Sequence, residues 1–245
     1  MLNMTDTRLP VRAHGLSDTG CVRKNNEDAF TLVPEAGLFI VADGVGGASS
    51  GEVAAQIAVQ SVAEHMRNTP RRDGAALTNA ITEAHNRVMS AGQDPERTGM
   101  ACTLVAALVN GSELILAHVG DSRAYVFLDA RIDFVTGDHT WVNEVGRKLD
   151  LSEAVLSMHP YRHVVTMAVG APGPFKVDLD AVPLAPGMRV LLCTDGLTDV
   201  VPDPLILAVA VGGETIESRA MSLITLATAA GAPDNVTVVL VDCEM

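Results

Sequence analysis

The sequence predicts an α+β protein in which antiparallel sheets are covered by pairs of helices. Two helical regions interrupt runs of strand-like sequence, and this order argues against alternating parallel βαβ units. The chain has 245 residues, of which 48% are hydrophobic, so it can bury a sizeable core within one domain spanning residues 1–245. Because aromatic residues make up only 3% of the chain, aliphatic side chains must dominate that core.

The first helical region consists of two expected helices, over about 50–68 and 73–91. Ser49 and Glu52 suit a capping box at the start of the first helix. Both helices carry apolar residues at helical spacing, which we interpret as core-facing stripes. The stripes comprise Ala54, Ala58, Val62 and Met66 in the first helix, and Leu77, Ile81, Ala84 and Val88 in the second.

Strand-like segments follow over about 101–135 and again over 164–193. The second helical region covers about 204–211 and 214–230. Its longer helix has one apolar face, made by Ile216, Ala220, Leu223 and Ala227. This face is also expected to pack in the core.

Four aspartates each lie beside a strongly apolar run. Asp43 closes LFIVAD, Asp121 closes LILAHVGD and Asp195 closes VLLCTD, whereas Asp234 precedes VTVVLV. A single Asp-Gly pair after a strand is usually a turn, but four such sites in one domain are harder to explain in that way. Ionised carboxylates that converge beside buried strands repel one another unless a cation compensates them. A metal ion with oxygen ligands would resolve that conflict.

A second group of polar residues lies upstream of these aspartates. Arg23, Asn26, Glu27 and Asp28 occur together in GCVRKNNEDAF, which in isolation reads as a solvated charged loop. An arginine at this place can also offer a planar fork to phosphate oxygens, and Asp28 can face the same pocket as the other carboxylates. After Asp43, consecutive glycines allow backbone carbonyls or amides to approach a ligand closely.

Five short motifs now occur in order along the chain. They are R-x-x-N-E-D at 23–28, A-D-G-V-G-G at 42–47, H-V-G-D-S-R at 118–123, T-D-G-L at 194–197 and D-N-V-T at 234–237. With these five motifs in this order, the chain resembles the metal-dependent Ser/Thr protein phosphatases of the PPM family (type 2C), in their compact bacterial form. The resemblance runs from about residue 11 to residue 241. Each motif alone is weak, but five in order are specific.

The resemblance implies a four-layer αββα sandwich with the metals at one edge, and a flap insertion at about 138–158. It also implies that Asp43, Asp195 and Asp234 hold two metal ions, and that the backbone carbonyl of Gly44 coordinates as well. Asp28 would act mainly through metal-bound water. Asp43 and Asp195 are thus expected to be catalytic.

By the same resemblance, Arg23 binds the substrate phosphate, and Asp121 joins Asp195 at a weaker third metal site. Oxygen ligands favour Mn²⁺ or Mg²⁺. Two such ions can supply a nucleophilic water and neutralise charge on the transferring phosphoryl group. Because no Cys or Ser nucleophile is needed, no phosphoenzyme intermediate is expected.

Several positions depart from the family pattern. Eukaryotic members often carry a histidine where this chain has Val45, so the general acid is unassigned. Bacterial relatives also commonly differ at 100–103 and 166–170, where this chain reads MACT and TMAVG. Neither change removes an expected metal ligand. Among the scattered histidines, His139 is the one to test for proton transfer, since it stands beside Asp138 at the entry to the flap.

Composition limits the partners. The net charge of -13 argues against nucleic-acid binding, which relies on a basic surface. None of the four cysteines shows zinc-ligand spacing, and no signal peptide or membrane-length apolar run is evident. We therefore expect a cytoplasmic protein in a reducing compartment, without membrane contacts, and a monomer.

Three functions remain open on the sequence. The leading hypothesis is a freestanding phosphatase for phosphoserine and phosphothreonine in proteins, which opposes a Ser/Thr kinase. A noncatalytic phosphoprotein-binding regulatory module on the same fold is the alternative from a different class. A third hypothesis keeps the phosphatase activity but places it in a sigma-factor regulatory switch with one small phosphoprotein substrate.

Overall fold

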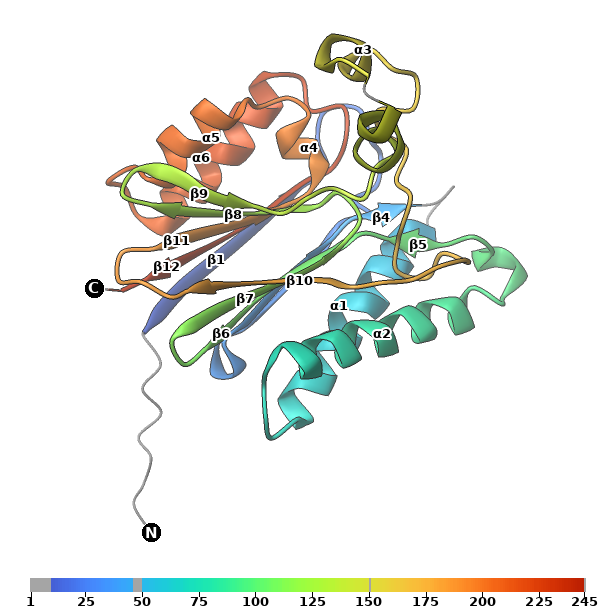
Figure 1. The fold of residues 1–245 in the computed structure, drawn as a ribbon, viewed down its shortest axis with the longest axis horizontal. Coiled ribbons are helices and arrows are strands. Elements are labelled where there is room, and N and C mark those ends of the chain that lie inside the picture. Colours follow the sequence, from blue (N-terminus) through green and yellow to red (C-terminus); the bar gives the residue numbers. More distant parts are fainter. Residues whose placement is uncertain (1–9, 46–49, 150, 245) are drawn as a thin grey trace.

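A computed structural model of the protein describes residues 10–45, 50–149 and 151–244. Two five-stranded sheets pack face to face, and every strand pairing in them is antiparallel (Figure 1). The first sheet has the order β1 (Val11–Asp18), β12 (Val236–Cys243), β11 (Arg189–Cys193), β8 (Arg123–Leu128) and β9 (Arg131–Val135). The second has the order β10 (Asp178–Pro183), β7 (Glu113–Val119), β6 (Leu104–Asn110), β3 (Leu38–Ala42) and β2 (Ala29–Val33).

A pair of helices covers the outer face of each sheet, which makes the four-layer αββα sandwich (Figure 1). Helices α1 (Ser50–Asn68) and α2 (Gly74–Ala91) cover the second sheet, whereas α5 (Asp203–Ala210) and α6 (Ile216–Ala229) cover the first. The predicted fold class is therefore confirmed. The described part of the chain contains no helix that is both long and apolar enough to cross a membrane.

Short elements connect these layers. A two-stranded ribbon pairs β4 (Gly44–Val45) with β5 (Ala101–Cys102). The short helices are the 3-10 turns at Pro34–Ala36, Pro95–Arg97 and Arg147–Leu149, a π-helical turn at Val142–Gly146, α3 (Glu153–Ser157) and α4 (Asp195–Thr198). In Figure 1 the segment containing α3 stands beyond the strand ends, close to α4.

Two of the long helices, α2 and α6, begin at residues whose side chains cap them. The Asp73 side chain accepts a hydrogen bond from the Ala76 amide at 2.9 Å, and the Thr215 side chain accepts one from the Ser218 amide at 3.2 Å. Each bond satisfies one of the amides that the first turn of a helix leaves unpaired. The capping box expected at Ser49 lies outside the described residues.

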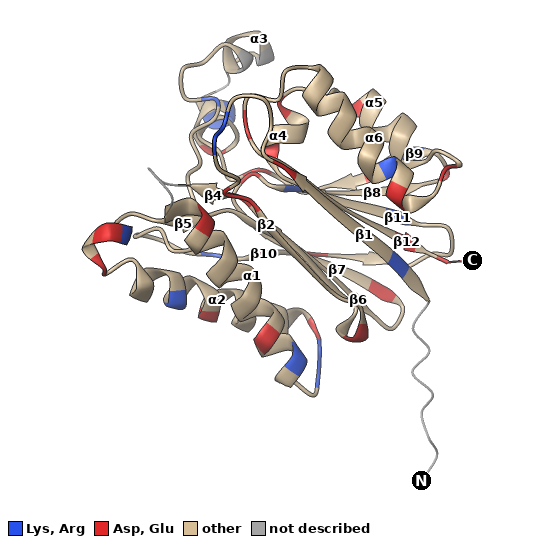
Figure 2. Ribbon diagram, turned by 180° about the vertical axis from the view of Figure 1, so that it is seen from behind, with Lys and Arg blue, Asp and Glu red and all other residues tan. Residues whose placement is uncertain are grey.

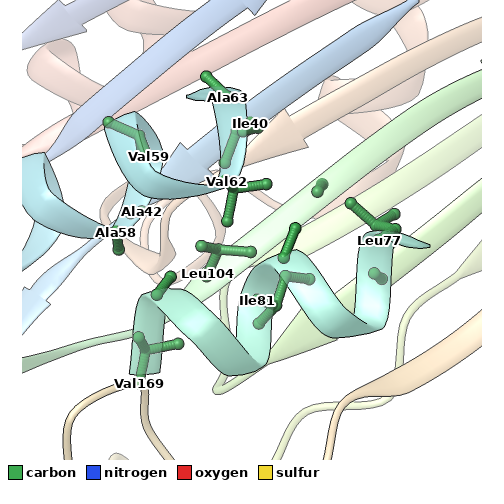
Figure 3. Close-up of a cluster of buried hydrophobic side chains, with 14 of the residues drawn as sticks. Ile40, Ala42, Ala58, Val59, Val62, Ala63, Leu77, Ile81, Leu104 and Val169 are labelled. Carbon is green, nitrogen blue, oxygen red and sulfur yellow. The ribbon is translucent and has the colours of Figure 1, made fainter. Parts of the chain in front are cut away.

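Aliphatic side chains fill three buried clusters, one between the sheets and one beneath each helix pair. Figure 3 shows the cluster under α1 and α2, where Val62 and Ile81 point towards Leu104 of β6. The stripes predicted on α1, α2 and α6 are all buried. The sequence periodicity therefore identified the core-facing side of these helices correctly.

The strand-like reading of residues 164–193 was wrong for its first half. Strands form only at β10 and β11, while 164–177 runs as a loop with isolated bridges at Val165 and Val169. Pro172 and Pro174 flank Gly173 in this loop. Proline cannot donate to a sheet ladder, so it limits regular pairing in this stretch.

We predict that Ile81→Ala destabilises the protein by about 2–5 kcal/mol, because it leaves a cavity under α2 where the side chain is fully buried. The matched control is Met89→Ala on the same helix, whose residue is 42% exposed and should cost less than about 0.5 kcal/mol if only surface packing is lost. Urea unfolding of both variants provides the test. Equal losses would show that burial under α2 does not determine the stability.

Candidate active site

The predicted site residues lie at one end of the sandwich, where the ends of both sheets meet. Ala29 of β2 pairs with Ala42 of β3, so Asp28 and Asp43 lie side by side at the end of the second sheet. Asp195 follows β11 and Asp234 precedes β12, the neighbouring strand of the first sheet. Asp121 lies in the turn that leads from β7 of one sheet to β8 of the other. The aspartates from distant parts of the chain are thus brought together.

A pocket of about 320 Å³ opens at this end. In Figure 2 acidic positions gather along the strand ends between β4 and α4. The lining of this pocket contains all the predicted site residues apart from Asp28. They are Arg23, Asp43, Gly44, Asp121, Asp195 and Asp234. Val45 also lines the pocket, whereas Gly46 and Gly47 of the glycine motif lie outside the described residues.

Asp28 is buried at the start of β2, and two threonines hold it. Its Oδ2 atom accepts hydrogen bonds from the hydroxyls of Thr194, at 3.0 Å, and Thr237, at 2.6 Å. Its Oδ1 atom is buried and has no hydrogen-bond partner, and the same holds for Oδ1 of Asp195. Buried carboxylate oxygens without partners are costly. These two atoms therefore mark a place where a cation or its bound water would fit.

Burial and the neighbouring carboxylates both disfavour the ionised form of these aspartates. Burial raises the pKa of Asp28 to about 7, although its two threonine bonds act in the opposite direction, and the charges of Asp195 and Asp234 raise it further. Burial likewise raises the pKa of Asp121 to about 7 and of Asp195 to about 6, and that of Asp43 well above its usual range. Hard divalent cations bind such sets of oxygen donors. The site is therefore chemically suited to Mn²⁺ or Mg²⁺.

Two glycines allow the close contacts on which the pocket depends. A Cβ atom at Gly44 would lie 2.3 Å from the carbonyl carbon of Gly51, and one at Gly196 would lie 1.9 Å from the carbonyl oxygen of Asn235. Backbone atoms cannot give way to such contacts cheaply. The glycines after Asp43 and Asp195 are thus required by packing, beyond any role in turns.

Asn235 joins the two loops that carry Arg23 and Asp234. Its side-chain amide donates to the carbonyls of Thr19 and Asn25, both at 2.9 Å, and its Oδ1 accepts from the Glu27 amide at 2.8 Å. Asn235, Thr194 and Thr237 were not among the residues predicted from the sequence to form the site. The one sequence feature that could have identified them is that each belongs to a short motif that also contains an expected metal ligand.

Arg23 reaches the site as expected, and its Nη2 atom donates to Oδ2 of Asp234 at 2.6 Å. The ion pair raises the pKa of the guanidinium. The Arg23 side chain is 52% exposed, so it also faces the solvent side of the pocket. An arginine in this position can meet an incoming anion.

A second pocket, of about 240 Å³, adjoins the first and shares Asp121, Asp195 and His163 with it. Its other side is lined by residues within the predicted flap at 138–158 and by Arg162, and the flap residues are Asp138, Thr140, Val142, Asn143, Arg147 and Leu156. The first residue of the predicted flap is held by Arg123, whose Nε and Nη2 atoms donate to the two carboxylate oxygens of Asp138 at 2.9 and 2.7 Å. Such a bidentate pair fixes geometry well.

His139 lines neither pocket. It is buried, and both of its ring nitrogens have partners in the Gly120 amide and the Asp178 carboxylate. Proton transfer by His139 stays a prediction, and its surroundings do not bring it to the substrate pocket. The two segments that depart from the family pattern, around Cys102 and Val169, form a β-bridge with each other.

The sequence profile described as Protein phosphatase 2C matches residues 22–210. The chain belongs to the protein phosphatase 2C family. The serine/threonine phosphatase stp of Listeria monocytogenes is 33% identical in an alignment of 238 residues that covers 94% of each chain. The serine/threonine protein phosphatase PstP of Mycobacterium tuberculosis is 36% identical over 98% of this chain, which spans 46% of that protein.

Solved structures of this protein phosphatase 2C fold superpose closely. The M. tuberculosis PstP structure matches with a TM-score of 0.88 at 34% identity and covers 96% of this chain and 99% of that one. A structure of the PstP catalytic domain in complex with two manganese ions matches with a TM-score of 0.85 at 33% identity, and covers 96% of this chain and 99% of that one.

We predict that the chelated protein loses stability as the pH rises from about 4 to about 7. The folded protein keeps protons on Asp28 and Asp121 up to about pH 7, whereas the unfolded chain releases them near pH 4. The folded state therefore binds more protons in this range, and its free energy of unfolding falls as the pH rises.

Thermal unfolding in excess chelator, at about pH 5.5 and about pH 8, tests this prediction. Asp28→Asn is the control, because it removes one of the titrating groups and should make the pH dependence shallower. A Tm of the chelated protein that rises between these two pH values would contradict the electrostatic account of the site.

Proposed function

We propose that the protein hydrolyses phosphoserine and phosphothreonine in other proteins with two Mn²⁺ or Mg²⁺ ions held at the strand ends. The observation that carries this proposal is the convergence of Asp43, Asp195 and Asp234 in one pocket, where Oδ1 of Asp195 is buried without a hydrogen-bond partner. Membership of the protein phosphatase 2C family supports it, as do relatives named serine/threonine phosphatases.

In this proposal Asp43, Asp195 and Asp234 hold the two ions, together with the carbonyl of Gly44. Asp28 acts through water, and Asp121 with Asp195 serves a weaker third ion. When bound, the ions supply an activated water and neutralise charge on the phosphoryl group. The threonines at Asp28 fix one of its oxygens and leave the other buried without a hydrogen-bond partner.

Arg23 orients the substrate by donating to its phosphate oxygens. With Asp234 engaged by a cation, the Arg23 guanidinium would exchange its bond to that carboxylate for bonds to phosphate. The paired donors of arginine match phosphate oxygens in number and direction. Arg23 thus holds the phosphorus in place while the acidic pocket wall holds the ions.

The proposal extends to the physiological setting. The substrates are phosphorylated proteins, and we propose that the enzyme opposes a Ser/Thr kinase as a single-domain, monomeric, cytoplasmic phosphatase, with residues 138–158 as its flap. Support for a reducing compartment comes from the cysteines, since all four are free thiols. A noncatalytic binding module is less well supported, because none of the expected carboxylates has been lost.

Asp195→Asn should abolish phosphate release from a phosphothreonine peptide, with the fold retained, because it removes a carboxylate that would contact the ions. Asp129→Asn is the matched control: it makes the same change on an exposed turn at φ 50°, a conformation that Asn accepts readily. The assay is titrated with Mn²⁺ and Mg²⁺ and repeated after chelation. Full activity of Asp195→Asn would refute the metal assignment.

Arg23→Ala should raise KM for the phosphopeptide by roughly 10-fold or more while changing kcat less, because a hydrogen bond to a charged group contributes about 1.5–3 kcal/mol. Arg131→Ala, at an exposed position on β9, controls for loss of one positive charge. Steady-state kinetics at saturating Mn²⁺ separate the two constants. An unchanged KM in Arg23→Ala would exclude the phosphate-binding role.

A further inference from the structure

A cluster of two histidines and an aspartate lies beside the metal pocket but outside its lining. His118 of β7 and His139 are buried, and their rings stack with centroids 4.8 Å apart. Asp178 of β10 pairs across the sheet with His118. One ligand atom from each of the three residues lies within 4.8 Å of the others, so the cluster resembles a metal site at first sight.

The hydrogen bonds of His139 argue against metal binding at this cluster. The Gly120 amide donates to Nδ1 of His139 at 3.2 Å, so Nδ1 carries a lone pair. The proton of the neutral ring is then on Nε2, which donates to Oδ2 of Asp178 at 3.1 Å. Coordination through Nε2 would move the proton to Nδ1, where it would face the Gly120 N–H. The tautomer present suits a structural bond.

The Gly120 backbone needs this bond. Gly120 has a φ of +104°, and a Cβ atom there would lie 2.6 Å from Cβ of Thr103. The bond from its amide to His139 is buried, so the amide would lack an acceptor without the imidazole. The carbonyl of Gly120 in turn accepts from the His139 amide at 2.9 Å. His139 therefore provides the hydrogen-bond partners of both the backbone N–H and the backbone C=O of Gly120.

Hydrogen bonds hold the chain on both sides of Asp121. His139 holds the residue before it, while Asp138 holds Arg123, two residues after it, through the bidentate pair. On the far side His139 is fixed by Asp178, and its ring stacks on His118, whose Nε2 donates to the Gly137 carbonyl at 2.6 Å. The turn carrying Asp121 is thus held by the first residues of the flap.

We propose that His139, oriented by Asp178, is a positioning residue that fixes the Gly120 backbone and so aims the Asp121 carboxylate at the cation site. The proposal rests on the proposed function of the site. It assigns the imidazole to the placement of a metal ligand and gives it no part in proton transfer. Loss of the bond should weaken ion binding at Asp121, since partners of metal ligands commonly contribute about 10–100-fold to metal affinity or activity.

Two substitutions of His139 test its hydrogen bonds to Gly120 and to Asp178 separately. His139→Asn places an amide oxygen near the position of Nδ1 and keeps an acceptor for Gly120. His139→Gln places its amide near Nε2, so it keeps the contact with Asp178 and loses that acceptor. We expect His139→Asn to stay close to the wild type, and His139→Gln to need about 10–100-fold more Mn²⁺ for half-maximal turnover. A merely structural role would not produce this difference between the two variants.

A second readout does not depend on turnover. Hydrogen exchange of the Gly120 amide, followed by NMR on the chelated protein, should be faster in His139→Gln than in His139→Asn or the wild type. If His139→Gln does not fold, Asp178→Ala replaces it, because it frees the Nε2 proton and should also accelerate exchange at Gly120. Electron paramagnetic resonance counts the Mn²⁺ ions bound by each variant.

The outcomes are distinct. Slower exchange in the Asn variant than in the Gln variant, with the matching order of Mn²⁺ dependence, supports the proposal. Equal exchange and equal Mn²⁺ dependence in both variants would overturn it, as would Co²⁺ binding by the wild type that His139→Asn abolishes. Wild-type protein without turnover would refute the proposed function, while the exchange of the Gly120 amide would still report on the bond.

Discussion

The mutual repulsion of carboxylates buried at one end of the sandwich is the constraint from which the rest of the site follows. Burial and neighbouring charge raise the pKa values of Asp28, Asp43, Asp121 and Asp195 together. Such a group is stable only if protons or cations compensate it. The pocket is thus built to bind positive charge, although the chain as a whole carries a net charge of -13.

The two-sheet architecture makes this crowding possible. Strands of both sheets end at the same edge, and the turn holding Asp121 crosses from one sheet to the other. Fully buried aliphatic layers on both sides of each sheet hold those ends in register. A rigid scaffold can keep unfavourable charges in place, because the packing energy of the whole domain supports a few costly positions.

The predicted flap is held by residues that also hold the turn of Asp121. A short ladder at its base joins His139 and Trp141 to Thr166 and Val164, and the bond from Arg123 to Asp138 joins it to β8. The predicted flap and the turn of Asp121 are therefore held by the same few residues.

The sequence by itself determined the long helices, their buried faces, and Arg23 and the aspartates of the pocket. Helical periodicity and short motifs are local patterns, so they can be read without knowing how the chain folds. Asn235, Thr194 and Thr237 escaped notice because their partners are far away in sequence: Thr237 bonds Asp28 across 209 positions and Thr194 bonds it across 166. Only the tertiary structure decided which hydroxyl met which carboxylate, and that His139 faces Gly120 instead of the pocket, because these contacts arise where separate strands end together.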